Sequence, residues 1–182
     1  DEDDHLYIEG KWKNDDLVSG KELDYRNGEV IYEGKMSYKN GRPIYNGKGT
    51  LKEDDDEYFT GTLKNGVKEG KGKIHRKDGT ITFEGTFQGN QKNGPGKSYY
   101  SNGNLAVEGK YLRGRLTGIV KTYYDSPDKR LEYVTKYERG LRRGKGKKYF
   151  YNGKVQLDGI FHGGFKRGRK YFSTGNGYED GV

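Results

Sequence analysis

The chain has 182 residues, of which 29% are apolar and 34% charged, and its formal net charge is +8. It contains no cysteine, which excludes disulfides, cysteine-based zinc sites and thiol chemistry. No apolar run approaches the length of a transmembrane span. The low apolar content favours disorder, but 17 tyrosines, 31 glycines and only 3 prolines oppose that interpretation, because tyrosine packs its ring and keeps its hydroxyl in water. The composition therefore predicts an extended fold with little central core.

A five-residue pattern, apolar-x-Gly-x-apolar, is the first predicted element and recurs along the chain. It occurs as IEGKW (8–12), YEGKM (32–36), FTGTL (59–63), FEGTF (83–87), VEGKY (107–111), YVTKY (133–137) and LDGIF (157–161). The central residues lie 24 to 27 positions apart, and only Thr135 breaks the glycine column. Strand side chains alternate between faces, so both apolar residues share one face and the glycine leaves room there for a neighbouring ring. The acidic residue beside the glycine then lies on the opposite face.

A second strand is predicted in each unit, after a turn at glycines. We expect these turns at Gly70-Lys71-Gly72, Gly94-Pro95-Gly96, Gly118, Gly144-Lys145-Gly146 and Gly168. Aromatic segments follow, and each unit closes with Asn-Gly or Asp-Gly at 27–28, 78–79, 102–103 and 152–153. These dipeptides tolerate positive φ at both positions of a two-residue hairpin turn. No segment has sustained 3.6-residue periodicity, so no substantial helix is expected.

The predicted fold is all-β, an elongated single twisted antiparallel sheet of about seven consecutive β-hairpins, or fourteen strands. We expect one repeat domain over 1–182, with the repeats at approximately 7–31, 32–57, 58–81, 82–105, 106–131, 132–155 and 156–178. Asp1–Asp4 and Gly177–Val182 are expected to cap the two ends of the array.

Gly96-Lys97-Ser98 is similar to the end of a P-loop, but the opening glycine of that motif would fall at Gln91. The flanking sequence is strand-like rather than strand-to-helix. The glycines are therefore assigned to the repeat, with Lys97 and Ser98 beginning a strand, and no nucleotide or other cofactor is expected.

The segments VEGKYLRGRLTGIVKTYY and FEGTFQGNQKNGPGKSYYSNG resemble the MORN repeat family, and the resemblance covers roughly residues 7–175. The YYxNGxL variant is similar to a bacterial subclass, which implies antitoxin-like, secreted or lipid-anchored relatives. The family fold implied is the hairpin sheet; the resemblance does not specify an activity. Departures are Thr135 and the longer connections at 53–57 and 124–132. Because the sequence begins with Asp1, we expect a processed or trimmed chain, and an extracytoplasmic or cell-surface location is slightly favoured over a cytoplasmic one.

No catalytic or metal-binding constellation is evident. His5, His75 and His162 lie in different repeats, and the acidic run 53–57 lacks the ligand order of an EF-hand loop. Carboxylates of the acidic column lie about 10 Å apart from one repeat to the next, which is too wide for a retaining glycosidase pair and at the edge of the range for an inverting one. We expect these carboxylates to pair with Lys or Arg across strands, namely Glu9, Glu33, Glu84, Glu108 and Asp158. The prediction is a protein that is not an enzyme.

The first functional hypothesis is a scaffold that binds another protein through exposed aromatic residues. The candidates are Tyr99, Tyr100, Tyr123, Tyr124, Tyr149, Phe150, Tyr171 and Phe172. In each adjacent pair the two rings face opposite sides of the sheet. The alternative is that the second ring of each pair simply covers the other face of a thin sheet.

The second hypothesis is binding to an anionic membrane lipid or acidic glycan. Residues 107–182 hold 18 Lys and Arg against 8 Asp and Glu, whereas residues 1–106 hold 17 against 19. The basic residues expected to stack along one edge are Arg113, Arg115, Arg139, Arg142, Arg143, Lys145, Lys147, Lys148, Lys166, Arg167, Arg169 and Lys170. The alternative is a charged edge that prevents aggregation. Nucleic-acid binding is a lesser hypothesis, because no recognition helix or RNP-like segment is present.

Overall fold

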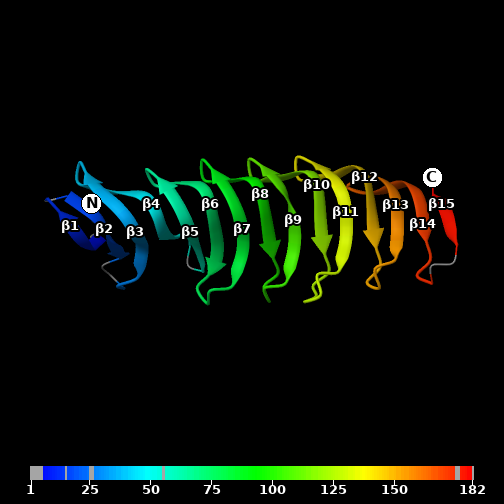
Figure 1. Ribbon diagram of the computed structural model, residues 1–182, viewed down its shortest axis with the longest axis horizontal. Coiled ribbons are helices and arrows are strands. Elements are labelled where there is room, and N and C mark those ends of the chain that lie inside the picture. The colour runs from blue at the N-terminus through cyan, green and yellow to red at the C-terminus, as the bar shows by residue number, and fades with distance from the viewer. Residues whose placement is uncertain (1–5, 15, 25–26, 55, 175–176, 182) are drawn as a thin grey trace. The chain divides into compact units, whose positions relative to one another are not determined.

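The structure of the protein, a computed structural model, describes residues 6–14, 16–24, 27–54, 56–174 and 177–181. Over these residues every regular element is a strand, and the fifteen strands form one open antiparallel sheet in chain order (Figure 1). The all-β prediction is confirmed. The strands are β1 (Leu6–Lys13), β2 (Asp16–Asp24), β3 (Val30–Lys39), β4 (Arg42–Lys52), β5 (Glu57–Lys64), β6 (Val67–Arg76), β7 (Ile81–Gln88), β8 (Gln91–Tyr99), β9 (Leu105–Leu112), β10 (Arg115–Tyr123), β11 (Leu131–Glu138), β12 (Leu141–Tyr149), β13 (Val155–His162), β14 (Gly164–Tyr171) and β15 (Tyr178–Gly181).

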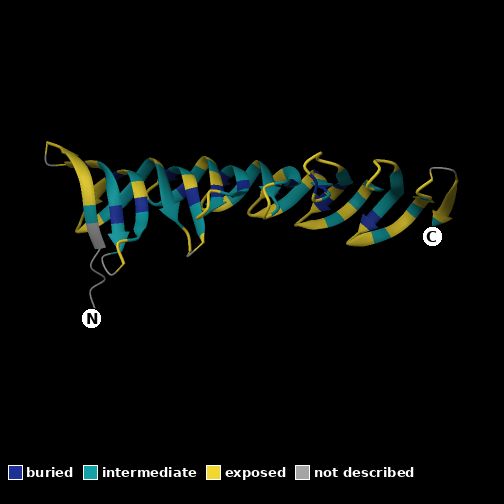
Figure 2. Cartoon of the chain, turned by 90° about the horizontal axis from the view of Figure 1, so that it is seen from below, coloured by how far each residue is buried: buried dark blue, intermediate teal, exposed yellow. Residues whose placement is uncertain are grey.

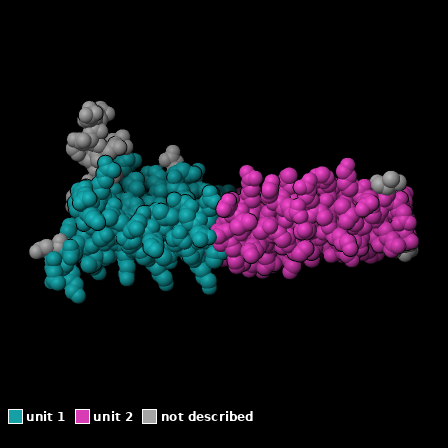
Figure 3. Space-filling model, turned by 90° about the horizontal axis from the view of Figure 1, so that it is seen from above, with its two compact units in different colours: residues 1–81, 86–91 teal, residues 82–85, 92–182 magenta. Residues whose placement is uncertain are grey.

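Two compact units divide the chain, residues 1–81 with 86–91 and residues 82–85 with 92–182 (Figure 3). In the second unit β15 adds a fifteenth strand where the sequence suggested only a polar cap. Its Gly181 pairs with Gly168 of β14, which continues the glycine column by one more strand. The N-terminal cap predicted at Asp1–Asp4 lies outside the described residues.

In the hairpins from β3–β4 to β11–β12, the first and second strands of a repeat are joined by two-residue turns in which both residues have positive φ, whereas Gly163 alone joins β13 to β14. Asn65 and Gly66 have φ of 51° and 76°, and Asn40 and Gly41 have 52° and 75°. Positive φ at both positions is the type I′ geometry, whose twist matches that of the flanking strands. The sequence prediction placed this turn several residues too late in each repeat.

The glycines predicted to form that turn lie inside the second strands instead. Thr62 pairs with Glu69 and Gly61 with Gly72, so Gly70 and Lys71 form a β-bulge in β6. The same bulge follows Arg142 in β12, where Gly144 has φ of 110°. Bulges and turns both call for positive φ, and this shared requirement misled the prediction. Gly94, Gly118 and Gly168 likewise lie within β8, β10 and β14, and Lys97 and Ser98 are interior to β8 rather than its beginning.

The turns between repeats are where the sequence predicted them, but their conformation differs. At Asn102-Gly103 only the glycine has positive φ, at 84°. The Asn102 side-chain oxygen accepts a hydrogen bond from the Asn104 N–H at 3.0 Å, and the Asn152 oxygen does the same for Lys154 at 3.0 Å. These are loops with an Asx turn closed by a left-handed glycine, rather than two-residue turns.

Aromatic rings lie on the glycine column, as the repeat pattern predicted. The fully buried Phe83 ring fills the space over Gly85 and Gly96, where an added Cβ would be 2.7 Å and 2.6 Å from its Cζ. Phe59 occupies the same seat over Gly61 and Gly72. Figure 2 shows such buried positions as dark blue bands within strands, while the hairpin turns are exposed.

Thr135 stands where the other repeats have glycine, and the neighbouring strand β10 also differs from the repeat pattern at the position that pairs with it. In the β9–β10 pair the ring position is Val107, which is too small to cover the glycine column. Val120 of β10 is fully buried in place of a glycine, and it pairs with Thr135, which is also fully buried. Two β-branched residues therefore fill the space that one aromatic ring fills in other repeats.

Buried tyrosines predict a loss of stability at alkaline pH. Burial raises the pKa of the Tyr32 phenol from 10.0 to about 12, and burial together with a hydrogen bond to Glu108 raises the pKa of Tyr123 to about 12. Below pH 10 both phenols stay protonated in the folded and unfolded states. Between pH 10 and about 12 the unfolded state ionises first, so the free energy of unfolding falls by up to about 1.4 kcal/mol per pH unit for each phenol. Urea unfolding at about pH 9 and about pH 11 measures this loss, and Tyr32→Phe should show a shallower decline; a decline as steep as in the parent chain would contradict it.

Candidate functional site: the basic face of residues 92–182

One register position beside the glycine column carries charged residues on the opposite face of the sheet. In the second unit the successive cross-strand partners at this position, here named the charge ladder, are Lys97, Glu108, Lys121, Val134, Lys147, Asp158, Arg169 and Asp180. Ion pairs join Lys121 to Glu108 at 3.8 Å, Lys147 to Asp158 at 3.2 Å and Arg169 to Asp180 at 3.6 Å. The expected cross-strand pairing of the acidic column is therefore found for Glu108 and Asp158.

The same pairing occurs in the first unit, described by itself. Lys21 of β2 pairs in register with Glu9 of β1 and Glu33 of β3, and its Nζ lies 3.4 Å from the Glu33 carboxylate. The row continues through Thr50 and Thr60, whose hydroxyls lie 3.1 Å apart. Over these five positions two carboxylates flank one cation, so this stretch of the row has no surplus of positive charge.

Further cations lie on the ladder face of the second unit. Each of these cations is an even number of residues from the ladder position of its own strand. Because side chains alternate between the two faces along a strand, these cations lie on the same face as the ladder. With the ladder cations they form the surface named here the basic face, and its six exposed members outside the ladder are Lys110, Arg115, Lys136, Arg143, Lys145 and Arg167. Within the described residues, the side chains of Arg115, Lys145 and Arg167 make no hydrogen bond or ion pair. Among these six cations, Lys136 is paired with a carboxylate, that of Glu138 at 3.0 Å. The positive charges of Arg115, Lys145 and Arg167 are therefore not neutralised by ion pairs in the part of the chain that the structure describes.

Two adjacent hairpin tips of this unit carry arginine in a left-handed backbone conformation. Arg113 and Arg139 have φ of 50° and 51°, where the first unit has asparagine at Asn40 and Asn65. Left-handed conformation favours glycine and asparagine and is costly for arginine. The tips are held in place, because the Gly114 N–H donates to the Lys92 carbonyl at 2.8 Å and the Gly140 N–H to the Leu116 carbonyl at 2.9 Å.

Each of these tips also exposes a leucine. Leu112, which precedes Arg113, is 56% exposed, and Leu141, two residues after Arg139, is 65% exposed. A cation and an exposed apolar side chain thus lie together at two consecutive turns.

The structure does not gather the twelve predicted basic residues on one edge. Arg113 and Arg139 are at turn tips, and six others belong to the basic face. Arg142, Lys148 and Lys170 pair in register with Tyr137, Tyr133 and Leu157 of the opposite face. Arg142 is held there, because its Nε donates to the Gly163 carbonyl at 3.2 Å and its guanidinium lies 4.2 Å from the Tyr133 ring centre. Lys166 lies exposed at the bulge of β14. Anion binding by these residues stays a prediction.

Most of the predicted aromatic candidates are less exposed than expected. Tyr123 is only 7% exposed, Phe172 is 50% exposed, and the other six are half-buried. The Tyr100 hydroxyl donates to the Tyr123 carbonyl and the Tyr124 hydroxyl to the Tyr149 carbonyl, each at 2.7 Å. Their hydroxyls thus join one repeat to the next, a use that residue type alone does not reveal. A partner-binding role for Tyr99, Tyr100, Tyr123, Tyr124, Tyr149, Phe150, Tyr171 and Phe172 stays a prediction.

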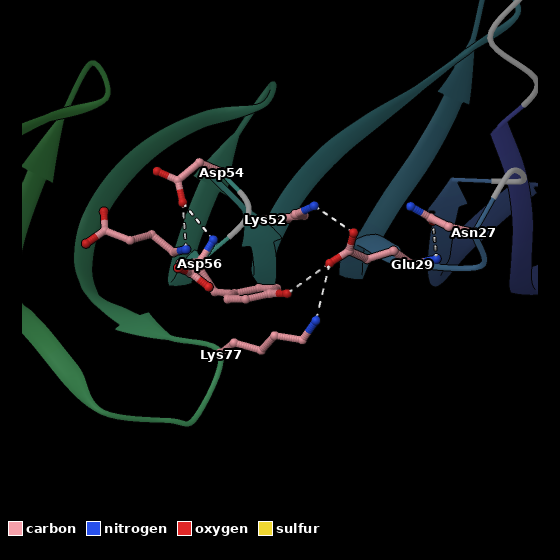
Figure 4. A network of polar contacts seen from close by, with 8 residues as sticks. Asn27, Glu29, Lys52, Asp54, Asp56 and Lys77 are labelled. Atoms are coloured by element: carbon pink, nitrogen blue, oxygen red, sulfur yellow. Dashed lines mark hydrogen bonds and ion pairs between the residues drawn. The ribbon is translucent and has the colours of Figure 1, made fainter.

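The acidic turn at 53–57 and the histidines make local contacts. Asp54 accepts the N–H groups of Asp56 and Glu57 at 3.0 and 2.8 Å, and nearby Glu29 binds Lys52 at 2.7 Å (Figure 4). The hydrogen bond from Lys52 lowers the pKa of the Glu29 carboxyl.

The ring of His75 stacks on Tyr58, and His162 contacts Arg143 at 3.1 Å, while His5 lies outside the described residues. In the described part of the chain no group of three His, Asp or Glu side chains is placed to hold a metal ion.

Comparison with known families matches a MORN repeat model to residues 59–81, 83–105 and 136–155. These three segments are similar to the MORN repeat. The first two matches cover the hairpins β5–β6 and β7–β8, and the third covers the turn and second strand of β11–β12. MORN repeats are commonly modules that interact with proteins or membranes. No curated protein matches the chain. The described residues include no helix of the length and hydropathy needed to cross a membrane.

Proposed function

We propose that this MORN-repeat protein is a non-enzymatic scaffold that binds another protein, and that the partner presents an acidic surface to the basic face. The observation that carries the proposal is the group of exposed cations Arg115, Lys145 and Arg167, whose side chains have no hydrogen bond or ion pair within the described residues. Charge complementarity of this kind speeds association and selects partners of opposite sign. A strand-built face also positions these side chains more firmly than loops would.

A charge-reversal variant tests this proposal. The triple variant Arg115→Glu, Lys145→Glu, Arg167→Glu removes the unpaired cations, and its exposed positions leave the buried column intact. Tagged parent and variant chains are used as baits in the native source at low salt and at about 0.5 M salt. We expect an acidic protein that the parent retains at low salt and that the variant and high salt both release. Equal recovery by the two baits would contradict the proposal.

Peripheral binding to an anionic membrane is the second candidate, and the two hairpin tips specifically favour it. Cations attract anionic headgroups, and exposed apolar side chains beside them insert into the interface. Arg113 with Leu112 and Arg139 with Leu141 supply this combination. An acidic glycan would use the arginines but would leave the leucines without a role.

The double variant Arg113→Asn, Arg139→Asn separates binding from folding. Asparagine suits the left-handed conformation, so the free energy of unfolding should rise by about 1 kcal/mol in total. Binding to phosphatidylserine-containing vesicles should weaken by roughly thirtyfold, since each cation near an anionic surface contributes about 1 kcal/mol. Vesicle flotation and urea unfolding measure the two effects. A matched variant, Leu112→Ser with Leu141→Ser, should weaken vesicle binding as well; unchanged binding by both variants would exclude the tips.

A further inference from the structure

The charge ladder of the second unit has one position without charge. Glu108 lies between Lys97 and Lys121, and Asp158 lies between Lys147 and Arg169. Val134 of β11 occupies the corresponding place between Lys121 and Lys147. If cations and carboxylates alternated along the whole ladder, β11 would carry a carboxylate at this position. It carries Val134 instead.

The surroundings of Val134 are basic and exposed. Lys136 lies two residues along β11 on the same face, and Lys145 lies two residues from Lys147 on β12. The side chains of Lys121 and Lys147 are about half exposed, and their strands are separated by the width of β11, about 10 Å from one to the other. A single carboxylate placed over Val134 can therefore approach both ammonium groups.

The carboxylates that face this position belong to other pairs. Glu108 is bound to Lys121, Asp158 to Lys147 and Glu138 to Lys136. Glu132 lies at the bulge opposite Tyr123, outside the ladder row. On the other side of the gap Ile119 is 64% exposed and pairs in register with Lys136, so it offers an apolar contact beside the cations.

We propose that the gap over Val134, bounded by Lys121, Lys136, Lys145 and Lys147, receives a Glu or Asp side chain from an acidic segment of the partner protein, which completes the charge ladder between the two chains. This inference rests on the proposed protein-binding function and names its recognition site. A carboxylate fits because the neighbouring ladder positions already hold carboxylates at the same spacing from the same kind of cation. The methylene groups of a glutamate would lie against Ile119 and Val134.

Filling the gap within the chain tests the assignment. Val134→Glu places the missing carboxylate on β11, and Val134→Thr keeps the β-branched shape without charge. The readout is the binding of a labelled polyglutamate peptide to the full chain, followed by fluorescence anisotropy at low salt. Val134→Glu should weaken binding about tenfold while the urea midpoint holds or rises, since opposite-charge cross-strand pairs are favourable. Val134→Thr should bind as the parent does. Equal binding by Val134→Glu and Val134→Thr would overturn the gap as the site.

A second pair of measurements keeps this test separate from that of the proposed function. If charge reversal at Arg115, Lys145 and Arg167 releases the native partner but Val134→Glu does not, the basic face binds protein and the gap assignment fails. If Val134→Glu weakens binding to phosphatidylserine vesicles but not to the peptide, the gap takes lipid headgroups, and the assignment to an acidic segment also fails. Loss of both peptide and native partner in Val134→Glu, with retention in Val134→Thr, supports the inference.

Discussion

Replacement of Gly72 by alanine is expected to lower the free energy of unfolding by about 3 kcal/mol, at the upper end of the range for overpacked cores. A Cβ at this position would overlap the Cε2 and Cζ atoms of the Phe59 ring. That ring is fully buried and packs edge-on against Phe87, with centroids 5.0 Å apart, so a shift of the ring away from the new Cβ would disturb this packing. Gly72 has no positive φ, and the cost is therefore steric rather than conformational.

The control for this prediction is Gly164→Ala. Gly164 begins β14, has no positive φ, and has nothing within 4 Å of an added Cβ. Its substitution should change the free energy of unfolding by less than about 0.5 kcal/mol. Urea unfolding followed by circular dichroism measures both variants. A Gly72→Ala midpoint equal to that of Gly164→Ala would show that the ring seat does not require glycine.

The strand pattern of this fold follows from the sequence because each row of the sheet has its own residue type. Glycine with an apolar residue on either side defines the packed face, and the acidic neighbour defines the charged face. The positions of the turns were harder to predict from the sequence. Gly70 and Gly144 have the positive φ of a turn residue, but they lie at bulges inside strands. The Asn-Gly pairs at 40–41 and 65–66 were the available signal for the true turns, since they suit type I′ geometry.

The candidate site could be predicted only in part. The surplus of Lys and Arg after residue 106 is a property of the sequence, but the face of each side chain depends on the bulges that shift the register. Arg142 and Arg143 are neighbours in sequence, yet one contacts Tyr133 and the other His162 on the opposite face. The gap at Val134 depends on which residues pair across neighbouring strands, and residue types alone do not specify that register.

The second large effect is a coupling between ring and glycine. Phe59→Val should cost about 3 kcal/mol, because it leaves a cavity over the glycines, and Gly72→Val alone should cost more than 3 kcal/mol, because it overlaps the ring. The double variant reproduces the arrangement of β9–β10, where Val107 and Val120 occupy these two positions and Val120 is fully buried. Its total loss should therefore be smaller than the sum of the single losses by about 2 kcal/mol.

Urea unfolding of the four chains in this cycle gives the coupling energy. The matched control pairs Phe59→Val with Gly96→Val, since Gly96 is the seat of Phe83 rather than of Phe59. That combination should be additive within about 0.5 kcal/mol. Additivity of Phe59→Val with Gly72→Val as well would mean that ring and glycine act independently. In that case Val120 and Thr135 would not be a replacement for the aromatic seat, and the tolerance of the column for Thr135 would need a different cause.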